Sequence, residues 1–343
     1  MNNGLRISSD FRMALFYISV VILFHGCSTT DDDRELIPVK VGITSYIGEA
    51  ATFVAVEKGF FRENGLDVTL QVNNAGSESI RQLYAGDVDI AHIAETPILY
   101  SKLQSGYYTG ERKGNLQIVA NMILANRIQK AVARRDAGIE TPGDIRGKRV
   151  ALARETQLEY LLDSFLLEHQ ISISEIDTMH MHVMDQAEAI KEGEIDVAFV
   201  WEPYATQILF NLDDNAVVLP TKLTYSTLWL INVLDSFSNE NPEIIKAYLK
   251  SILQAQQYIR ENPAWAIELL AEKTSTEYDV VHTVINQIDY ELNLSELMLN
   301  LLKEQQRWML ESGIADQGEI DIFDLINFEY MEEIYPQGIS LIR

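Results

Sequence analysis

Short apolar runs alternate with amphipathic segments along the first part of the chain. Runs at 39–43, 66–72 and 90–93 predict three strands. The segment 48–59 and a stretch that ends at Gly86 predict two helices, since glycine adopts the left-handed conformation that closes a helix. This β-α-β-α-β order is typical of one α/β lobe.

The same order returns in the middle of the chain. Runs at 149–153, 178–183 and 197–200 again predict strands. A helix over about 155–169 and a second one that ends near Gly193 lie between them. Two similar halves predict two lobes, and two lobes predict a cleft between them.

A shorter unit is shared by the two halves. In each, a glycine and an acidic residue precede a short strand, and a glutamate follows it: Gly86 leads to Glu95, and Gly193 leads to Glu202. Both glutamates follow the carboxyl end of a strand, where open α/β sheets bind ligands. We therefore expect Glu95 and Glu202 to reach the cleft from opposite lobes. A chance recurrence of common α/β units is the alternative.

Composition and charge narrow the classes of partner. The chain has 343 residues, of which 47% are hydrophobic, and this is enough for two domains. Its formal net charge is −24, from 51 acidic and 27 basic side chains. Nucleic acids and anionic lipids both need a basic face, so neither is expected as a partner.

No cofactor and no catalytic set are expected from the motifs. The sequence contains neither the Gly-x-Ser-x-Gly pattern nor a phosphate-binding loop. A hydrolase that uses Glu95 and Glu202 as paired carboxylates stays an alternative. A metal held by His180 and His182 is a weaker one, because no further histidine or cysteine pair accompanies them.

The N-terminus has the pattern of an export signal. Arg6 and Arg12 precede the apolar run 14–24, which is too short to span a bilayer. Cys27, the only cysteine, follows a small residue just after this run, as in a bacterial lipoprotein. Phe24 and His25 depart from the usual residues before such a cysteine. An ordinary signal peptide is the alternative.

On this pattern we predict a lipoprotein signal peptide over 1–26, lipidation of Cys27 and a polar tether over 27–36. The mature protein would then be anchored to a membrane surface in the bacterial cell envelope, facing the periplasm or the cell exterior.

Several segments resemble one family of extracytoplasmic proteins. They are the run 42–70 with its Glu-Lys-Gly-Phe-Phe turn, the segment 144–150, the Trp-Glu-Pro motif at 201–203, and 241–270 with two Asn-Pro pairs that predict helix starts capped by asparagine. Together they resemble the solute-binding proteins of ABC importers in the nitrate, sulfonate, taurine and thiamine-precursor (NMT1/THI5-like) family.

The resemblance implies a type II periplasmic binding protein fold, with two α/β lobes joined by a two-crossing hinge. We expect the crossings near 125–131 and 224–228. Lobe 1 would comprise 37–128 and 226–343, and lobe 2 would comprise 129–225.

The implied function is capture of a small solute, without catalysis, by a monomer that delivers it to an ABC permease and ATPase. A solute sensor is the alternative.

Loops after the strands of both lobes supply the expected ligand contacts. They are Thr44, Ser45, Tyr46, Asn74, Gly76, Ser77, Glu95, Thr96, Glu155, Thr156, Asp185, Trp201 and Glu202. Helix N-termini at Ser77 and near Thr156 suit an anion such as a sulfonate. The acidic residues instead favour a nitrogen-containing neutral or cationic ligand, such as a pyrimidine or an amine.

Aromatic residues complete this expectation. Trp201, Tyr46, Tyr204 and Trp229 are expected to stack on a flat or cationic group. Because Ala94 takes the place of Trp201 in the first copy of the unit, the aromatic wall is expected on lobe 2.

Overall fold

The computed structural model describes residue 1 and residues 35–126, 128–222 and 225–342. Residues 2–26 of the predicted signal peptide and residues 27–34 of the predicted tether, including Cys27, lie outside these residues. The chain divides into two units, Met1–Glu35 and Leu36–Arg343, and the second contains both β-sheets. Over the described part of the chain, no helix is long and apolar enough to cross a membrane.

The first sheet has six strands in the order β11-β4-β10-β3-β1-β2. Strand β1 pairs in parallel with β2 and β3, whereas β10 is antiparallel to β3 and β4. Its strands are β1 (Ile37–Thr44), β2 (Leu66–Asn73), β3 (Ile90–Ile93), β4 (Leu116–Asn126), β10 (Ser226–Leu234) and β11 (Ile288–Asn293).

The second sheet has five strands in the order β7-β6-β8-β5-β9. Strand β6 pairs in parallel with β7 and β8, and β5 is antiparallel to β8 and β9. Its strands are β5 (Gln129–Arg134), β6 (Arg149–Leu152), β7 (Asp177–His180), β8 (Val197–Trp201) and β9 (Ala216–Leu219).

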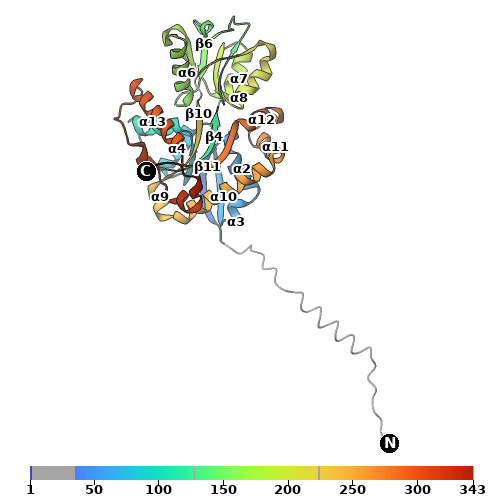
Figure 1. The fold of residues 1–343 in the computed structure, drawn as a ribbon, viewed down its shortest axis with the longest axis vertical. Coiled ribbons are helices and arrows are strands. Elements are labelled where there is room, and N and C mark those ends of the chain that lie inside the picture. The colour runs from blue at the N-terminus through green and yellow to red at the C-terminus, as the bar shows by residue number, and fades with distance from the viewer. Residues whose placement is uncertain (2–34, 127, 223–224, 343) are drawn as a thin grey trace. The chain divides into compact units, whose positions relative to one another are not determined.

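Helices cover both sheets. Figure 1 shows α6 on one side of the five-stranded sheet and α7 and α8 on the other. The helices are α2 (Ala50–Glu57), α3 (Phe60–Glu63), α4 (Gly76–Ala85), α5 (Glu95–Leu103), α6 (Gln157–Glu168), α7 (Val183–Lys191), α8 (Tyr204–Leu212), α9 (Asp235–Glu240), α10 (Pro242–Glu261), α11 (Pro263–Lys273), α12 (Tyr278–Val284), α13 (Glu296–Glu311) and α14 (Glu329–Ile334). Each sheet has its own cluster of buried apolar residues.

The chain passes between the sheets twice. It leaves the six-stranded sheet after β4 to enter β5, and it returns from β9 to β10. This is the type II periplasmic binding protein fold, with two α/β lobes joined by two crossings, and the predicted fold class is confirmed. The lobe boundaries 128/129 and 225/226 fall between these strands and stay a prediction. We call the part with the six-stranded sheet lobe 1 and the other part lobe 2.

The repeated unit has the same local structure in both lobes. Gly86 and Gly193 have φ angles of 75° and 76°, in the left-handed region that favours glycine. Asp89 accepts a hydrogen bond from the backbone N–H of Lys40 on β1. Asp196 does the same for the N–H of Arg149 on β6. The acidic residue directly before each repeated strand therefore binds the backbone of the neighbouring parallel strand.

Two local predictions were wrong. The strand expected over 178–183 ends at His180, because the ring of His182 accepts a hydrogen bond from Met184 N–H and caps α7. Pro242 and Pro263 do begin helices, as predicted. However, the asparagine before each proline does not cap its helix. Its amide instead donates to a carbonyl of the preceding helix, Phe237 O for Asn241 and Tyr258 O for Asn262.

Candidate ligand-binding site

A cavity of about 150 Å³ lies between the two lobes, where the parallel strands of both sheets end. Many of the residues predicted for ligand contact line it: Thr44, Ser45, Tyr46, Asn74, Gly76, Thr156 and Trp201. The other lining residues are Val72, Asn73, Ala75, Ala94, Pro97, Gln157, His182, Val183, Met184, Tyr204, Thr227 and Trp229. Strand-end loops from both lobes therefore meet at one site.

Four aromatic residues of the described part of the chain line the cavity. Trp201 and Tyr204 come from lobe 2, whereas Tyr46 and Trp229 come from lobe 1. The rings of Tyr46 and Trp229 are in contact, with centroids 5.2 Å apart. The expectation that the aromatic wall lies on lobe 2 was wrong, because β10 brings Trp229 to the same cavity from the other side.

Helix N-termini also face the cavity. Lining residues begin α4 (Ala75 and Gly76), α5 (Ala94), α6 (Thr156) and α7 (His182). The first N–H groups of a helix have no partner within the helix and carry partial positive charge. The helix N-termini thus give the cavity a partial positive charge, and no arginine, lysine, aspartate or glutamate among the described residues lines it.

Two of the residues that line the cavity carry hydroxyl groups without a hydrogen-bond partner among the described residues. These hydroxyls belong to Thr44 and Tyr46, and both oxygens are buried. Tyr46 is only 6% exposed, and burial raises the pKa of its hydroxyl well above the ordinary value. The Tyr46 hydroxyl therefore keeps its proton and is a hydrogen-bond donor. Buried hydroxyls without a partner are uncommon and point to a missing acceptor.

Glu95 does not line the cavity. Its side chain is fully buried and accepts hydrogen bonds from the hydroxyl of Tyr225 and from Leu228 N–H, which is 3.2 Å away. Tyr225 and Leu228 lie where the chain returns to lobe 1. The first glutamate of the repeat is thus bound to the second hinge crossing.

Glu202 is placed at the other crossing. It is fully buried, forms an ion pair with Lys130 and accepts a hydrogen bond of 2.9 Å from Thr206 N–H. Its own N–H donates to Ile128 O, 2.8 Å away, in the segment that leads into β5. Both glutamates therefore bind the segments that join the lobes. Their contact with a ligand stays a prediction, and these hydrogen bonds do not support it.

Replacing Glu95 with glutamine is expected to remove a pH dependence of stability. Burial raises the pKa of Glu95 from its usual 4.5 to about 7. Between these values the folded protein binds the proton more tightly than the unfolded chain does. The stabilisation is therefore complete below about pH 4.5 and is lost as the pH rises through 7. Relative to Glu95→Gln, the wild-type protein should lose on the order of 2 to 3 kcal/mol between pH 4.5 and 8.

Urea unfolding of both proteins at several pH values measures this difference. Because all other titrating groups are common to the two proteins, the difference isolates Glu95. A constant difference across that range would contradict an ionisation near pH 7 at the hinge.

The remaining predicted residues lie around the cavity without lining it. Thr96 is buried and donates to Gln305 Oε1 at 2.8 Å. Glu155 forms an ion pair of 3.1 Å with Arg81 of lobe 1. Ser77 is half-buried in the first turn of α4, and Asp185 is exposed on α7. Their contact with a ligand stays a prediction.

His182 is a lining residue that the sequence did not single out for this role. Its Nε2 lies 2.9 Å from Asn74 O of lobe 1, and its Nδ1 accepts from Met184 N–H. The ring therefore bridges the two lobes at the cavity edge. The sequence analysis placed His182 inside a strand over 178–183. In the structure it lies at the start of α7, where it faces the cleft.

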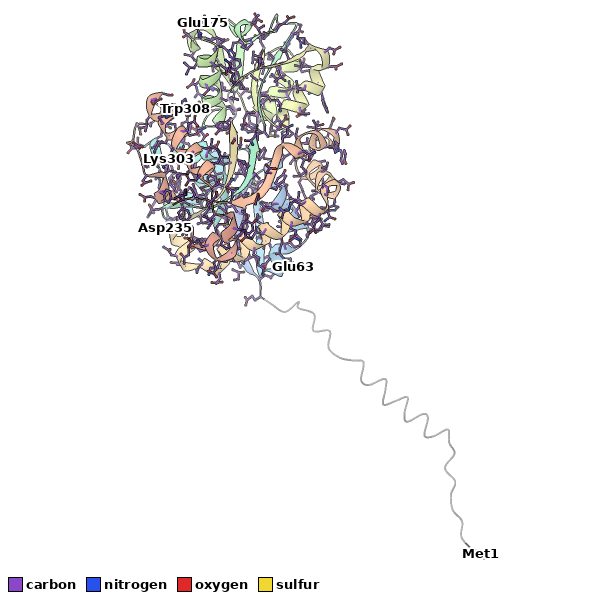
Figure 2. All side chains as sticks on the ribbon, viewed as in Figure 1. Met1, Glu63, Glu175, Asp235, Lys303 and Trp308 are labelled. Atoms are coloured by element: carbon purple, nitrogen blue, oxygen red, sulfur yellow. The ribbon has the colours of Figure 1, made fainter. Side chains whose placement is uncertain are left out.

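Further hydrogen bonds join the lobes along α6. The hydroxyl of Tyr100 donates to Glu159 at 2.6 Å, and that of Tyr160 donates to Glu304 at 2.6 Å. Trp308, labelled in Figure 2, donates from Nε1 to Asp163 at 3.0 Å. The same figure shows Glu63 and Glu175 far from this contact, at opposite ends of the folded unit. The lobes are thus in direct contact across the cleft.

Comparisons with known proteins agree with this architecture. The model of the family "NMT1/THI5 like" matches residues 48–266. The taurine-binding periplasmic protein of Escherichia coli (strain K12) is 24% identical over 225 residues, covering 63% of this chain and 65% of that protein.

Two solved structures share the fold. The alkanesulfonate-binding protein SsuA from Xanthomonas axonopodis pv. citri, bound to MOPS, superposes with a TM-score of 0.71 and 15% identity, covering 86% of this chain and 99% of that one. The periplasmic nitrate-binding protein NrtA from Synechocystis PCC 6803 gives a TM-score of 0.67 and 15% identity, covering 88% and 89%.

Two α/β lobes, two crossings and a cavity between strand ends define the type II periplasmic binding protein fold. Within that class, the chain belongs to the NMT1/THI5-like family. The relatives named above are binding proteins.

Proposed function

We propose that this protein captures a small organic oxyanion of the sulfonate class in the cavity between its lobes and delivers it to an ABC importer. The observation that carries the proposal is that two lining residues, Thr44 and Tyr46, have hydroxyls without a partner among the described residues, in a cavity faced by four helix N-termini. Sulfonate oxygens accept hydrogen bonds in several directions at once, so such donors would satisfy them together.

The charge of the lining supports an anion over a cation. A bound ammonium group needs carboxylate or carbonyl acceptors, and the nearby carboxylates of Glu95 and Glu202 are bound at the hinge. Helix N-termini disfavour a positive charge. This reverses the preference for a nitrogen-containing neutral or cationic ligand that the acidic residues suggested from the sequence alone.

Transport is the role that the relatives support. The taurine-binding relative is periplasmic by name, and this chain carries the predicted export signal. On this proposal the protein is a monomer outside the cytoplasm, anchored through Cys27, and it docks on a permease whose ATPase drives uptake. A sensor that reports the same ligand to a membrane receptor would use the same cavity.

A flat nitrogen-containing ring, such as a pyrimidine, is the second candidate ligand. The observation in its favour is the aromatic wall, since Trp201, Tyr204, Trp229 and Tyr46 offer ring faces for stacking. A paired-carboxylate hydrolase has no such support, because Glu95 and Glu202 do not line the cavity.

A thermal-shift screen of the purified full-length protein tests the ligand class. Each anion is paired with a cation of the same carbon skeleton: hexanesulfonate with hexylamine, and taurine with ethylenediamine. Nitrate and a 4-aminopyrimidine complete the set. A ligand at about 100 times its Kd stabilises the folded state by about 2.7 kcal/mol, which should raise Tm by several degrees.

We expect hexanesulfonate or taurine to raise Tm and the matched amines to leave it unchanged. A shift with the amines or the pyrimidine, together with none from the sulfonates, would overturn the anion proposal.

A further inference from the structure

A buried carboxylate lies directly behind the aromatic wall. Glu49 precedes α2 and is fully buried. Its Oε1 accepts a hydrogen bond of 2.7 Å from the indole N–H of Trp229, whose ring lines the cavity. Its Oε2 accepts from the hydroxyl of Thr52 at 2.7 Å. Glu49 thus connects the wall to the interior of lobe 1.

The connection continues through His92 to Tyr248. His92 Nδ1 lies 2.8 Å from Glu49 Oε2, and His92 Nε2 lies 2.9 Å from the hydroxyl of Tyr248. A carboxylate only accepts, so His92 Nδ1 is the donor in the hydrogen bond to Glu49. His92 and Tyr248 are fully buried, and neither lines the cavity. Among the described members of this chain of hydrogen bonds, Trp229 alone faces the ligand site.

This arrangement fixes the orientation of the Trp229 ring. An indole has a single N–H, so binding it to an immobile acceptor sets the rotation of the ring about its side-chain bond. Glu49 is immobile because the donors Thr52 and His92 hold its other oxygen. The ring of Tyr46, 5.2 Å from that of Trp229, then packs against a fixed partner.

Packing alone does not explain why a carboxylate occupies the buried position of Glu49. A buried carboxylate stabilises a fold no better than an apolar side chain of similar volume, and it is costly when any donor is missing. Holding a binding surface in its final geometry before the ligand arrives does improve affinity. Three donors converge on Glu49, and one of them belongs to the ligand site.

We propose that Glu49 is a positioning residue of the ligand site, which holds the indole of Trp229 in its ligand-ready orientation. The identity of the ligand rests on the function proposed above, whereas the orientation of the ring does not.

Indole ¹⁵N–¹H NMR of the full-length protein tests the orientation directly. The Trp229 signal is assigned from its loss in Trp229→Phe. In Glu49→Leu the indole N–H loses its acceptor, so its proton resonance should move upfield and its hydrogen exchange should accelerate at least tenfold. Met331→Ala provides a control of comparable instability, because Met331 is fully buried on α14 and does not line the cavity.

Titration calorimetry with hexanesulfonate supplies the second measurement. We expect Glu49→Leu to raise Kd at least tenfold and Met331→Ala to change it less than twofold. Equal losses of affinity in the two variants would assign Glu49 a purely structural role and overturn the proposal. If Glu49→Leu does not fold, Glu49→Gln replaces it, with an expected upfield shift of the indole proton and a threefold rise in Kd.

The two proposals fail separately. If neither hexanesulfonate nor taurine binds the wild-type protein, the sulfonate proposal fails, and the NMR measurement still decides the role of Glu49. An unchanged Trp229 indole signal in the Glu49 variant would overturn the positioning role whatever the ligand is.

Discussion

Replacing Lys130 with methionine is expected to lower the free energy of unfolding by about 3 kcal/mol. Lys130 forms an ion pair with Glu202, whose side chain is fully buried at the first hinge crossing. Methionine keeps most of the side-chain length but removes the ammonium group. The carboxylate of Glu202 would retain its hydrogen bonds from Thr206 and lose its counter-charge in a place that water reaches poorly.

Urea unfolding measures this loss, and Lys191→Met is the matched control. Lys191 pairs with Glu188 at 3.4 Å on the exposed side of α7, with side chains that are 49% and 66% exposed. An exposed pair of this kind contributes at most about 1 kcal/mol. The double variant Lys130→Met/Glu202→Leu should recover part of the loss, because it removes the unpaired charge as well. Equal effects of Lys130→Met and Lys191→Met would contradict the role of the buried pair.

The course of the backbone was largely predictable from the sequence, because its signals are local. Gly86 and Gly193 end helices for a reason contained in one residue, namely the left-handed conformation that glycine allows. The apolar run 90–93 coincides with β3. The repeated order of elements follows from such signals, and it was sufficient to predict two α/β lobes.

The positions of the two repeated glutamates were not predictable in this way. A residue at the end of a strand can point into the cleft or toward the hinge, and distant residues decide which. Glu95 is held by Tyr225, which is 130 positions away in the chain. Glu202 is held by Lys130, 72 positions away. No local pattern contains these partners. The sequence therefore placed both glutamates correctly at strand ends, but the predicted contact with a ligand has no support.

The same limit applies to the ligand's charge. Counting acidic residues in the strand-end loops favoured a nitrogen-containing neutral or cationic ligand, but the side chains of Glu95, Glu155 and Glu202 are bound to other protein groups. The features left at the cavity are backbone N–H groups and hydroxyl-bearing residues, which carry no formal charge and therefore do not enter a count of charged residues. The Glu49 network was also invisible, because Thr52, His92 and Trp229 converge only in the folded protein.

Removing both unpartnered hydroxyls with Tyr46→Phe and Thr44→Val is expected to weaken sulfonate binding at least 100-fold without lowering stability. A hydrogen bond to a charged group contributes about 1.5 to 3 kcal/mol, so two of them account for a factor of 100 or more. Neither hydroxyl has a protein partner among the described residues. Their removal therefore breaks no protein hydrogen bond there and leaves the free energy of unfolding unchanged or slightly raised.

Calorimetric titration with hexanesulfonate and urea unfolding together check this prediction, because they separate affinity from stability. The matched control is Tyr330→Phe, since the hydroxyl of Tyr330 donates to Ser238 O at 3.1 Å in lobe 1 and does not line the cavity. That variant should lose stability and keep its affinity, the reverse of the double variant. If the double variant binds hexanesulfonate as tightly as the wild-type protein does, the hydroxyls do not contact the anion, and helix N-termini alone would have to account for its binding.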